Sequence, residues 1–206
     1  MLEVTSLRLR PRAAGAAGGF TLIELLVTLS IIVVAMTIAV PSMVTFQRNA
    51  ELTSATNSLT AAINAARGEA MKRNLNAFVI PVDGTLWTSG FLVFVDRDRT
   101  QSYGSATDLL VMTQSPLPAY LTVVGTGTAS GSTPYVMFNG TGYTTNKAAA
   151  GLVNLAITIS RTDVATGSAT YEQTRNVMIA QTGRVRVCKP TAVTAVSGAD
   201  CATDSP

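Results

Sequence analysis

An unbroken apolar run near the N-terminus constrains this chain more than any other feature. Between Phe20 and Val40 the only charged residue is Glu24. As a helix this run spans ~31 Å, which matches the ~30 Å hydrocarbon core of a bilayer. Arg8, Arg10 and Arg12 precede it, so the leader should stay on the cytoplasmic side of a membrane and the rest of the chain should be exported.

Three interpretations of the run compete: a secretory signal peptide cut after its apolar core, an ordinary membrane anchor, and a leader cut before the apolar core. Glu24 favours the third, because a charge inside a membrane segment costs a few kcal/mol and usually marks a function. A signal peptide would also need a small-residue cleavage site after the run, and the residues 37–43 offer none of the A-x-A type.

The segment Gly19–Val27, read GFTLIELLV, resembles the N-terminus of type IV prepilins. The resemblance implies that a prepilin peptidase cuts after Gly19 and methylates the new terminal residue, Phe20. Glu24 then becomes the fifth residue of the mature chain, and Pro41 falls where the family often has a helix-weakening proline.

Glu24 then has a physical role in filament assembly. Subunits that leave the bilayer pack their apolar helices in a dry core, where a lone charge is strongly unfavourable. The carboxylate of Glu24 can pair with the terminal amine at Phe20 of a neighbouring pilin, which favours one axial register.

The composition argues against catalysis. The chain has no histidine, which removes the commonest general base and the commonest nitrogen ligand for metals. We expect neither an enzyme, nor a cofactor, nor a small-molecule substrate. Asp96 and Asp98 hint at a calcium loop, but the glycine and distal glutamate of such a loop are missing, so a charged turn is the better interpretation.

The rest of the sequence predicts an α+β fold. After Pro41 a helical pattern resumes to about Asn74, with an apolar seam. The seam residues are Leu52, Thr56, Leu59, Ile63, Ala66 and Ala70. Eight β-type runs follow, at 77–82, 90–95, 109–114, 120–124, 135–138, 152–160, 175–180 and 184–187.

Successive strands without intervening helices favour one mainly antiparallel sheet of about six to eight strands. We therefore expect a leader at 1–19, a transmembrane and filament-core helix at 20–41, a head domain at 42–190, and a tail at 191–206.

A second resemblance covers most of the mature chain. The segments 66–74 (ARGEAMKRN), 90–98 (GFLVFVDRD) and 183–187 (GRVRV), together with Trp87, are similar to the FimT/GspH group of minor pilins and pseudopilins. The resemblance implies a low-copy subunit that primes or caps a filament. It also implies two alternatives: pilus proteins, some of which bind DNA for natural transformation through a Gly-Arg-x-Arg motif, and pseudopilins of type II secretion.

The motif sits in a predicted hairpin with the loop Gln181–Gly183. This loop pairs residues 180 with 184, 179 with 185, 178 with 186 and 177 with 187, and places Gly183 at the left-handed position. Val177, Ile179, Val185 and Val187 should then face the core, with Arg184 and Arg186 facing solvent on the other side.

Four basic residues and no acid lie between Gln173 and Pro190: Arg175, Arg184, Arg186 and Lys189. The pattern alone favours a solvated strand near a sheet edge, where charges block unwanted pairing. The resemblance of Gly183–Arg186 to the DNA-binding motif favours contacts to the phosphates of double-stranded DNA. No aromatic residue interleaves the arginines, so base stacking is not expected.

Cys188 and Cys201 should form a disulfide, because the exported side of the membrane is oxidising. The bond would tie the tail to the last strand and contribute about 3 kcal/mol.

The favoured interpretation is a minor type IV pilin. It sits in the inner membrane with its head in the periplasm and then in a pilus, and its partners are other pilins and DNA. The alternatives are a GspH-like pseudopilin, which neighbouring genes would distinguish, and an adhesin that binds a glycan through its loops.

Overall fold

The computed structural model describes residues 19–148, 151–164 and 173–190. It divides into two compact units, one ending at Thr45 and the other beginning at Phe46. One helix, α1 (Leu22–Arg73), contributes to both units. The predicted helix between Thr21 and Asn74 is therefore confirmed to within one residue at each end.

The ends of α1 are set by local chemistry. Thr21 is the N-cap: its hydroxyl accepts a hydrogen bond from the backbone N–H of Glu24 at 3.2 Å. At the other end Asn74 adopts a left-handed conformation (φ 53°), and the N–H of Leu75 donates to the carbonyl of Ala70 at 3.2 Å. This is the Schellman arrangement that ends many helices. The helix assignment is continuous through Pro41.

In the second unit α1 buries a single stripe. All six predicted seam residues are buried, with exposed fractions of 2% or less. Their spacing of three and four residues places them on one face, and this face packs on the sheets. The predicted seam is confirmed.

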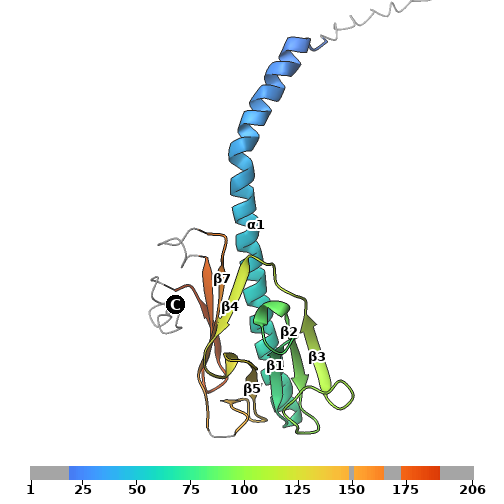
Figure 1. Ribbon diagram of the computed structural model, residues 1–206, viewed down its shortest axis with the longest axis vertical. Coiled ribbons are helices and arrows are strands. Elements are labelled where there is room, and N and C mark those ends of the chain that lie inside the picture. Colours follow the sequence, from blue (N-terminus) through green and yellow to red (C-terminus); the bar gives the residue numbers. More distant parts are fainter. Residues whose placement is uncertain (1–18, 149–150, 165–172, 191–206) are drawn as a thin grey trace, which may run out of the picture. The chain divides into compact units, whose positions relative to one another are not determined.

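The strands form two antiparallel sheets. The first has the order β3-β2-β1-β5-β6, with bounds β1 Ala77–Pro81, β2 Phe91–Val95, β3 Leu109–Gln114, β5 Val136–Phe138 and β6 Thr144–Thr145. The second has the order β4-β7-β8-β9, with bounds β4 Leu121–Gly125, β7 Leu155–Arg161, β8 Thr174–Ile179 and β9 Val185–Cys188. Two short 3-10 helices, η1 (Trp87–Ser89) and η2 (Gly127–Ala129), lie in the connections. In Figure 1 the C-terminal part of α1 lies beside β1, β2 and β4.

The expectation of one sheet was wrong. The α+β class and the antiparallel pairing are confirmed, but the described residues hold nine strands in two sheets. The chain leaves the first sheet after β3, forms β4, and returns to the first sheet with β5. The strand periodicity is the same in either sheet, so the pattern could not show this exchange. β6 lies between the predicted runs 135–138 and 152–160, where no strand was predicted.

One core joins α1 to both sheets. Apolar side chains from the helix seam, from one face of β1 and β2, and from β7 and β8 form a single buried cluster. Trp87 closes it and donates its ring N–H to the carbonyl of Ala129 at 2.9 Å. A smaller cluster around Phe78 and Phe94 lies on the opposite face of the first sheet.

Candidate functional site

The apolar side chains of the first unit are not covered by other residues of that unit. Within α1 one stretch is long and apolar enough to cross a membrane, and none of it is buried. Large apolar side chains are exposed all along it, from Phe20 (82%) through Leu22, Ile23, Leu25, Leu26, Val27, Leu29, Ile31, Ile32, Val33, Val34, Met36, Ile38, Val40, Met43 and Val44. A soluble domain would not leave so much apolar surface in water.

Glu24 lies in the first turn of α1, at the third position after the N-cap Thr21. The order Thr-x-x-Glu is a capping-box sequence, and a carboxylate at a helix N-terminus interacts favourably with the helix dipole. Gly19 precedes the helix and is exposed, and the rest of the leader lies outside the described residues. Cleavage after Gly19 and the pairing of Glu24 with Phe20 remain predictions.

The hairpin of β8 and β9 has the predicted register. Val177 pairs with Val187, Met178 with Arg186 and Ile179 with Val185. Gly183 has the left-handed backbone that the loop requires (φ 77°), and its N–H donates to the carbonyl of Ala180 at 2.8 Å.

This register divides the four predicted basic residues into two pairs. Side chains alternate between faces along a strand, so Arg184 and Arg186 share the face of Met178. Arg175 shares the opposite face with Val177 and Ile179, and Lys189, just beyond β9, continues the alternation on that side. Arg184 and Lys189 are exposed, whereas Arg175 and Arg186 are half-buried.

Three details of the hairpin differ from expectation. Arg186 was expected to face solvent but is half-buried. Val187 was expected in the core but is 42% exposed, because β9 is the edge strand of its sheet and its far end reaches beyond the buried cluster. Burial lowers the pKa of Arg175, whose guanidinium donates to the carbonyl of Thr174 at 2.8 Å. Arg175 is therefore less accessible to a ligand than Arg184.

Arg67, which the sequence reasoning did not single out, joins the helix to this hairpin. Its Nε donates to the carbonyl of Gly142 at 3.0 Å and its Nη2 donates to the carbonyl of Thr182 at 2.9 Å. The signal was present in the segment 66–74, but only the tertiary structure brings its partners, both 75 or more positions away, to the helix.

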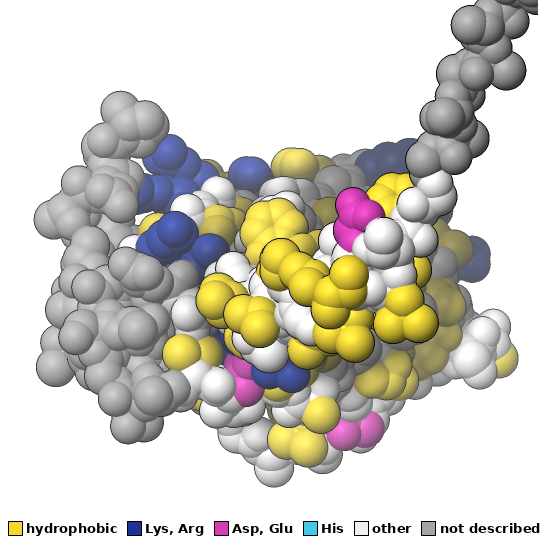
Figure 2. All heavy atoms as spheres, turned by 90° about the horizontal axis from the view of Figure 1, so that it is seen from above, with side chains coloured by type: hydrophobic (Ala, Val, Ile, Leu, Met, Phe, Trp, Pro, Cys, Tyr) yellow, Lys and Arg dark blue, Asp and Glu magenta, His cyan; other side chains and the backbone are white. Residues whose placement is uncertain are grey.

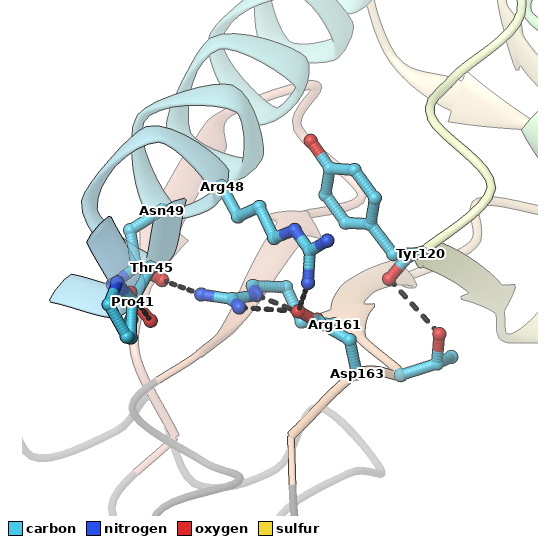
Figure 3. Close-up of polar contacts among 8 residues, drawn as sticks. Pro41, Thr45, Arg48, Asn49, Tyr120, Arg161 and Asp163 are labelled. Atoms are coloured by element: carbon cyan, nitrogen blue, oxygen red, sulfur yellow. Dashed lines mark hydrogen bonds and ion pairs between the residues drawn. The ribbon is translucent and has the colours of Figure 1, made fainter. Parts of the chain in front are cut away.

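A second polar cluster, centred on Arg161, contacts α1 at Arg48 and Asn49, where the part of the helix that belongs to the head begins (Figure 3). Arg161 is buried and grips the carboxylate of Asp163 through Nε (2.9 Å) and Nη2 (2.6 Å). Its Nη1 donates to the side chain of Asn49 at 2.8 Å. Arg48 pairs with the same carboxylate and lies over the ring of Tyr120. The Arg161 guanidinium, with Arg48, holds the pKa of Asp163 well below its usual range.

The charged turn after β2 contains one more carboxylate than the sequence suggested. Oxygens of Asp96, Asp98 and Asp108 lie within 4.8 Å of one another. Backbone N–H groups occupy several of these oxygens: Thr100 and Gln101 donate to Asp96, and Arg97 donates to Asp108. Burial raises the pKa of Asp96, and the charge of Asp108 adds to this. These bonds explain how the cluster shapes its own loop.

A shallow hollow of about 180 Å³ lies on the outer face of the first sheet, lined in part by Phe94, Tyr103, Tyr135 and Lys147. The ammonium of Lys147 lies 5.0 Å from the centre of the Tyr135 ring, a cation–π distance.

The structure describes only one of the two cysteines of the predicted disulfide. Cys188 ends β9, but Cys201 lies outside the described residues, so this bond also stays a prediction.

On the face drawn in Figure 2, the basic side chains do not form one continuous surface. Lys and Arg side chains lie at several separate places there, with hydrophobic, other uncharged and acidic side chains between them. A nucleic-acid contact through this face would therefore be local, at one group of residues.

Comparisons with known proteins agree with this picture. The family described as "Type II transport protein GspH" matches residues 55–199, and a "Prokaryotic N-terminal methylation motif" matches residues 16–40. No similar sequence was found among curated proteins.

The comparison with solved structures found two similar proteins. The type IV minor pilin FimU of Pseudomonas aeruginosa has 16% identity and a TM-score of 0.50, over 71% of this chain and 98% of its own. The minor pseudopilin EpsH of the Vibrio cholerae type 2 secretion system has 14% identity and a TM-score of 0.47, over 69% of this chain and 99% of its own. With the family match spanning most of the chain and the methylation motif at its N-terminus, the chain belongs to the GspH family, within the group of minor pilins and pseudopilins.

Proposed function

We propose that this protein is a minor subunit of a type IV pilus, anchored in the inner membrane with its head in the periplasm and then incorporated into the filament through the first half of α1. The observation that carries the proposal is the exposed apolar surface from Phe20 to Val44, on a helix with Glu24 in its first turn. Lipid covers this surface before assembly and neighbouring helices cover it afterwards. The proposal requires no catalysis.

Glu24 gives the assembly a fixed register. Its carboxylate is the single formal charge between Phe20 and Val44. In a dry helical core it needs a cation, and the amine that cleavage creates at Phe20 of a neighbour supplies one. A subunit without the carboxylate would leave that amine buried and unpaired.

The test compares the same substitution in the two halves of one helix. We expect Glu24→Ala to insert and to be processed normally but to be depleted from isolated filaments. Glu51→Ala is the matched control, because Glu51 lies in the head half and accepts a weak 3.4 Å hydrogen bond from the side-chain amide of Gln47. Membrane fractionation and quantitative immunoblotting of sheared filaments measure both. Normal incorporation of Glu24→Ala, or equal loss in the control, would remove the charge pairing.

Processing provides an independent test of the leader. Mass spectrometry of the mature protein should show an N-methylated Phe20 as the first residue. A mature chain that begins beyond Val40 would instead establish a conventional signal peptide.

We further propose that the head binds double-stranded DNA without sequence preference through Arg184 and Arg186, as in DNA uptake for natural transformation. The confirmed register supports this, since Arg184, directly before β9, and Arg186, within it, share one face of the hairpin with backbone positions about 7 Å apart, within reach of successive phosphates. Because Arg175 and Lys189 lie on the other face, the contact would be small. Non-specific binding of this kind has Kd values of roughly 10⁻⁴ to 10⁻⁶ M at physiological salt.

A salt series separates this site from general attraction. Each neutralised phosphate adds about 0.9 to the slope of log K against log salt. In titrations of the mature protein in detergent, Arg184→Gln/Arg186→Gln should lower the slope by about 2. The control Arg97→Gln/Arg99→Gln removes two exposed charges from another loop and should not change it. No binding by the parent at low salt, or equal slopes for both variants, would contradict the site.

The second candidate is a minor pseudopilin of a type II protein secretion system, which the description of the matching family favours. A deletion strain distinguishes the two. Loss of exoprotein secretion with normal pili would establish the pseudopilin, whereas loss of pili or of DNA uptake with normal secretion would establish the pilin.

A further inference from the structure

We propose that Arg67 is a positioning residue: it fixes the tip of the β8–β9 hairpin, and so the direction of Arg184, without contacting DNA itself. This inference rests on the proposed DNA binding. Its structural half, the control of the hairpin by Arg67, can be tested separately.

The geometry of the guanidinium carries the first step. Arg67 lies on α1 and donates to two carbonyls from separate loops, Gly142 at 3.0 Å and Thr182 at 2.9 Å. Thr182 is the middle residue of the three-residue hairpin loop. A planar guanidinium presents its donors in a fixed fork, so both bonds together define where the loop tip lies relative to the helix.

The second step comes from how closely the three segments approach. A Cβ placed on Gly183 would lie 2.1 Å from the carbonyl oxygen of Gly142 and 2.6 Å from Nε of Arg67. A Cβ on Gly142 would lie 2.6 Å from the sulfur of Met71. Both glycines also have left-handed backbones. The two loops and the helix surface therefore meet at a point where no side chain fits between them.

This contact assigns a packing role to the glycine of the Gly183–Arg186 motif. Gly183 serves the packing against Arg67 and Gly142, and the arginines that follow it serve the ligand. Arg184 is the next residue and directly precedes β9, so a tilt of the loop tip would move its guanidinium, whereas Arg186 is paired with Met178 and would stay in place.

Other bonds hold the base of the loop, and within the loop the N–H of Gly183 donates to the carbonyl of Ala180, whereas Arg67 joins the tip to the helix. The carbonyl of Gln181 accepts from the N–H of Thr144 at 3.0 Å, and the N–H of Gln181 donates to the side chain of Asn154 at 2.9 Å. Neither bond involves Thr182 or Gly183. Loss of the Arg67 contacts should therefore free the tip while the strands stay paired.

The decisive variant is Arg67→Lys. Lysine keeps the positive charge, but a single ammonium on a flexible stem cannot reproduce the fork. Arg67→Ala removes both the charge and the fork. If Arg67 acts by position, the two variants should weaken DNA binding equally, about ten-fold at low salt, and lower the salt slope by about one, through the displaced Arg184. If Arg67 acted as one more phosphate contact, Arg67→Lys would bind like the parent, which would overturn the proposal.

Arg48→Lys is the matched control. It alters an arginine on the same helix that also bridges to a distant loop, at Asp163, but not to the hairpin. It should leave the salt slope of the parent unchanged. All proteins are compared as mature chains in detergent, at a temperature well below the thermal midpoint of the weakest variant, so that unfolding does not contribute.

Amide hydrogen exchange tests the structural half without DNA. Gly183 and Arg184 should exchange faster in Arg67→Lys than in the parent, while Val177 and Ile179 keep their protection. Unchanged exchange at Gly183 would overturn the positioning role whatever the DNA result. Faster exchange together with no DNA binding by the parent would contradict the proposed DNA contact. Arg67 would then still be the residue that holds the hairpin.

Discussion

The two halves of α1 use apolar residues in different ways. From Leu22 to Val44 the large apolar side chains are exposed on all sides of the helix. From Leu52 to Ala70 a single stripe is apolar and is buried against both sheets. The apolar side chains of the second half are buried by the rest of the chain, whereas those of the first half can be buried only by lipid or by other subunits.

Polar contacts lie at both ends of the half of α1 whose apolar stripe is buried against the sheets. Arg48 and Asn49, directly after the boundary between the two units, bind Asp163 and Arg161. At the other end Arg67 binds the loops at Gly142 and Thr182. The head thus holds its part of the helix at both ends, which gives the apolar stripe between them a fixed position.

The largest expected effect is a loss of stability when a side chain of the buried stripe is truncated. Leu59→Ala removes a side chain that is 2% exposed and should cost roughly 3–4 kcal/mol of unfolding free energy, a fall of roughly 10 °C in the midpoint. Leu29→Ala makes the same change at a residue that is 52% exposed and should leave the midpoint unchanged. Circular dichroism melts of the mature protein in detergent measure both. Equal falls would show that the first half also belongs to the folding unit of the head.

The next effect concerns the boundary. Asp163→Asn leaves the buried Arg161 without its carboxylate and should cost about 3 kcal/mol at neutral pH. Because the folded protein lowers the pKa of Asp163, its stabilisation is present above the unfolded pKa of about 3.9 and is lost as the pH falls below it.

Urea unfolding of both proteins between neutral and acidic pH checks the sign. The difference in unfolding free energy between parent and Asp163→Asn should be constant above about pH 5 and shrink as the pH is lowered. A difference that grows on acidification would contradict the ion pair.

The smallest effect lies at the start of the first half. Thr21→Ala removes the N-cap bond to Glu24 and should cost about 1 kcal/mol of local helix stability. Faster amide exchange at Glu24 and Leu25 in micelles, with an unchanged thermal midpoint, is the expected result. Thr53→Ala is the control, because the Thr53 hydroxyl bonds only back to Asn49 within the helix. If Glu24 exchanges at the parent rate, Thr21 is not the cap of the membrane-inserted helix.

Much of the fold was predictable because its signals are local. The helix ends at Thr21 and Asn74, the seam, and the register of the β8–β9 hairpin depend on neighbouring residues and on the periods of helix and strand. The exposure of Val187 was not predictable, since it depends on β9 being an edge strand. Arg67 and Arg161 escaped notice because their partners are far away in the sequence and carry no pattern of their own.

The sequence by itself therefore determined the apolar helix with its single carboxylate at Glu24, the α+β class, the buried seam and the hairpin that carries Arg184 and Arg186. Each of these follows from composition or from a periodicity within a few residues. Only the tertiary structure decided that the strands divide into two sheets, that Val187 is exposed on an edge strand, and that Arg67 holds the hairpin. These features depend on which distant backbone carbonyls and apolar faces come together, and long-range packing selects among strand pairings that local patterns leave equivalent.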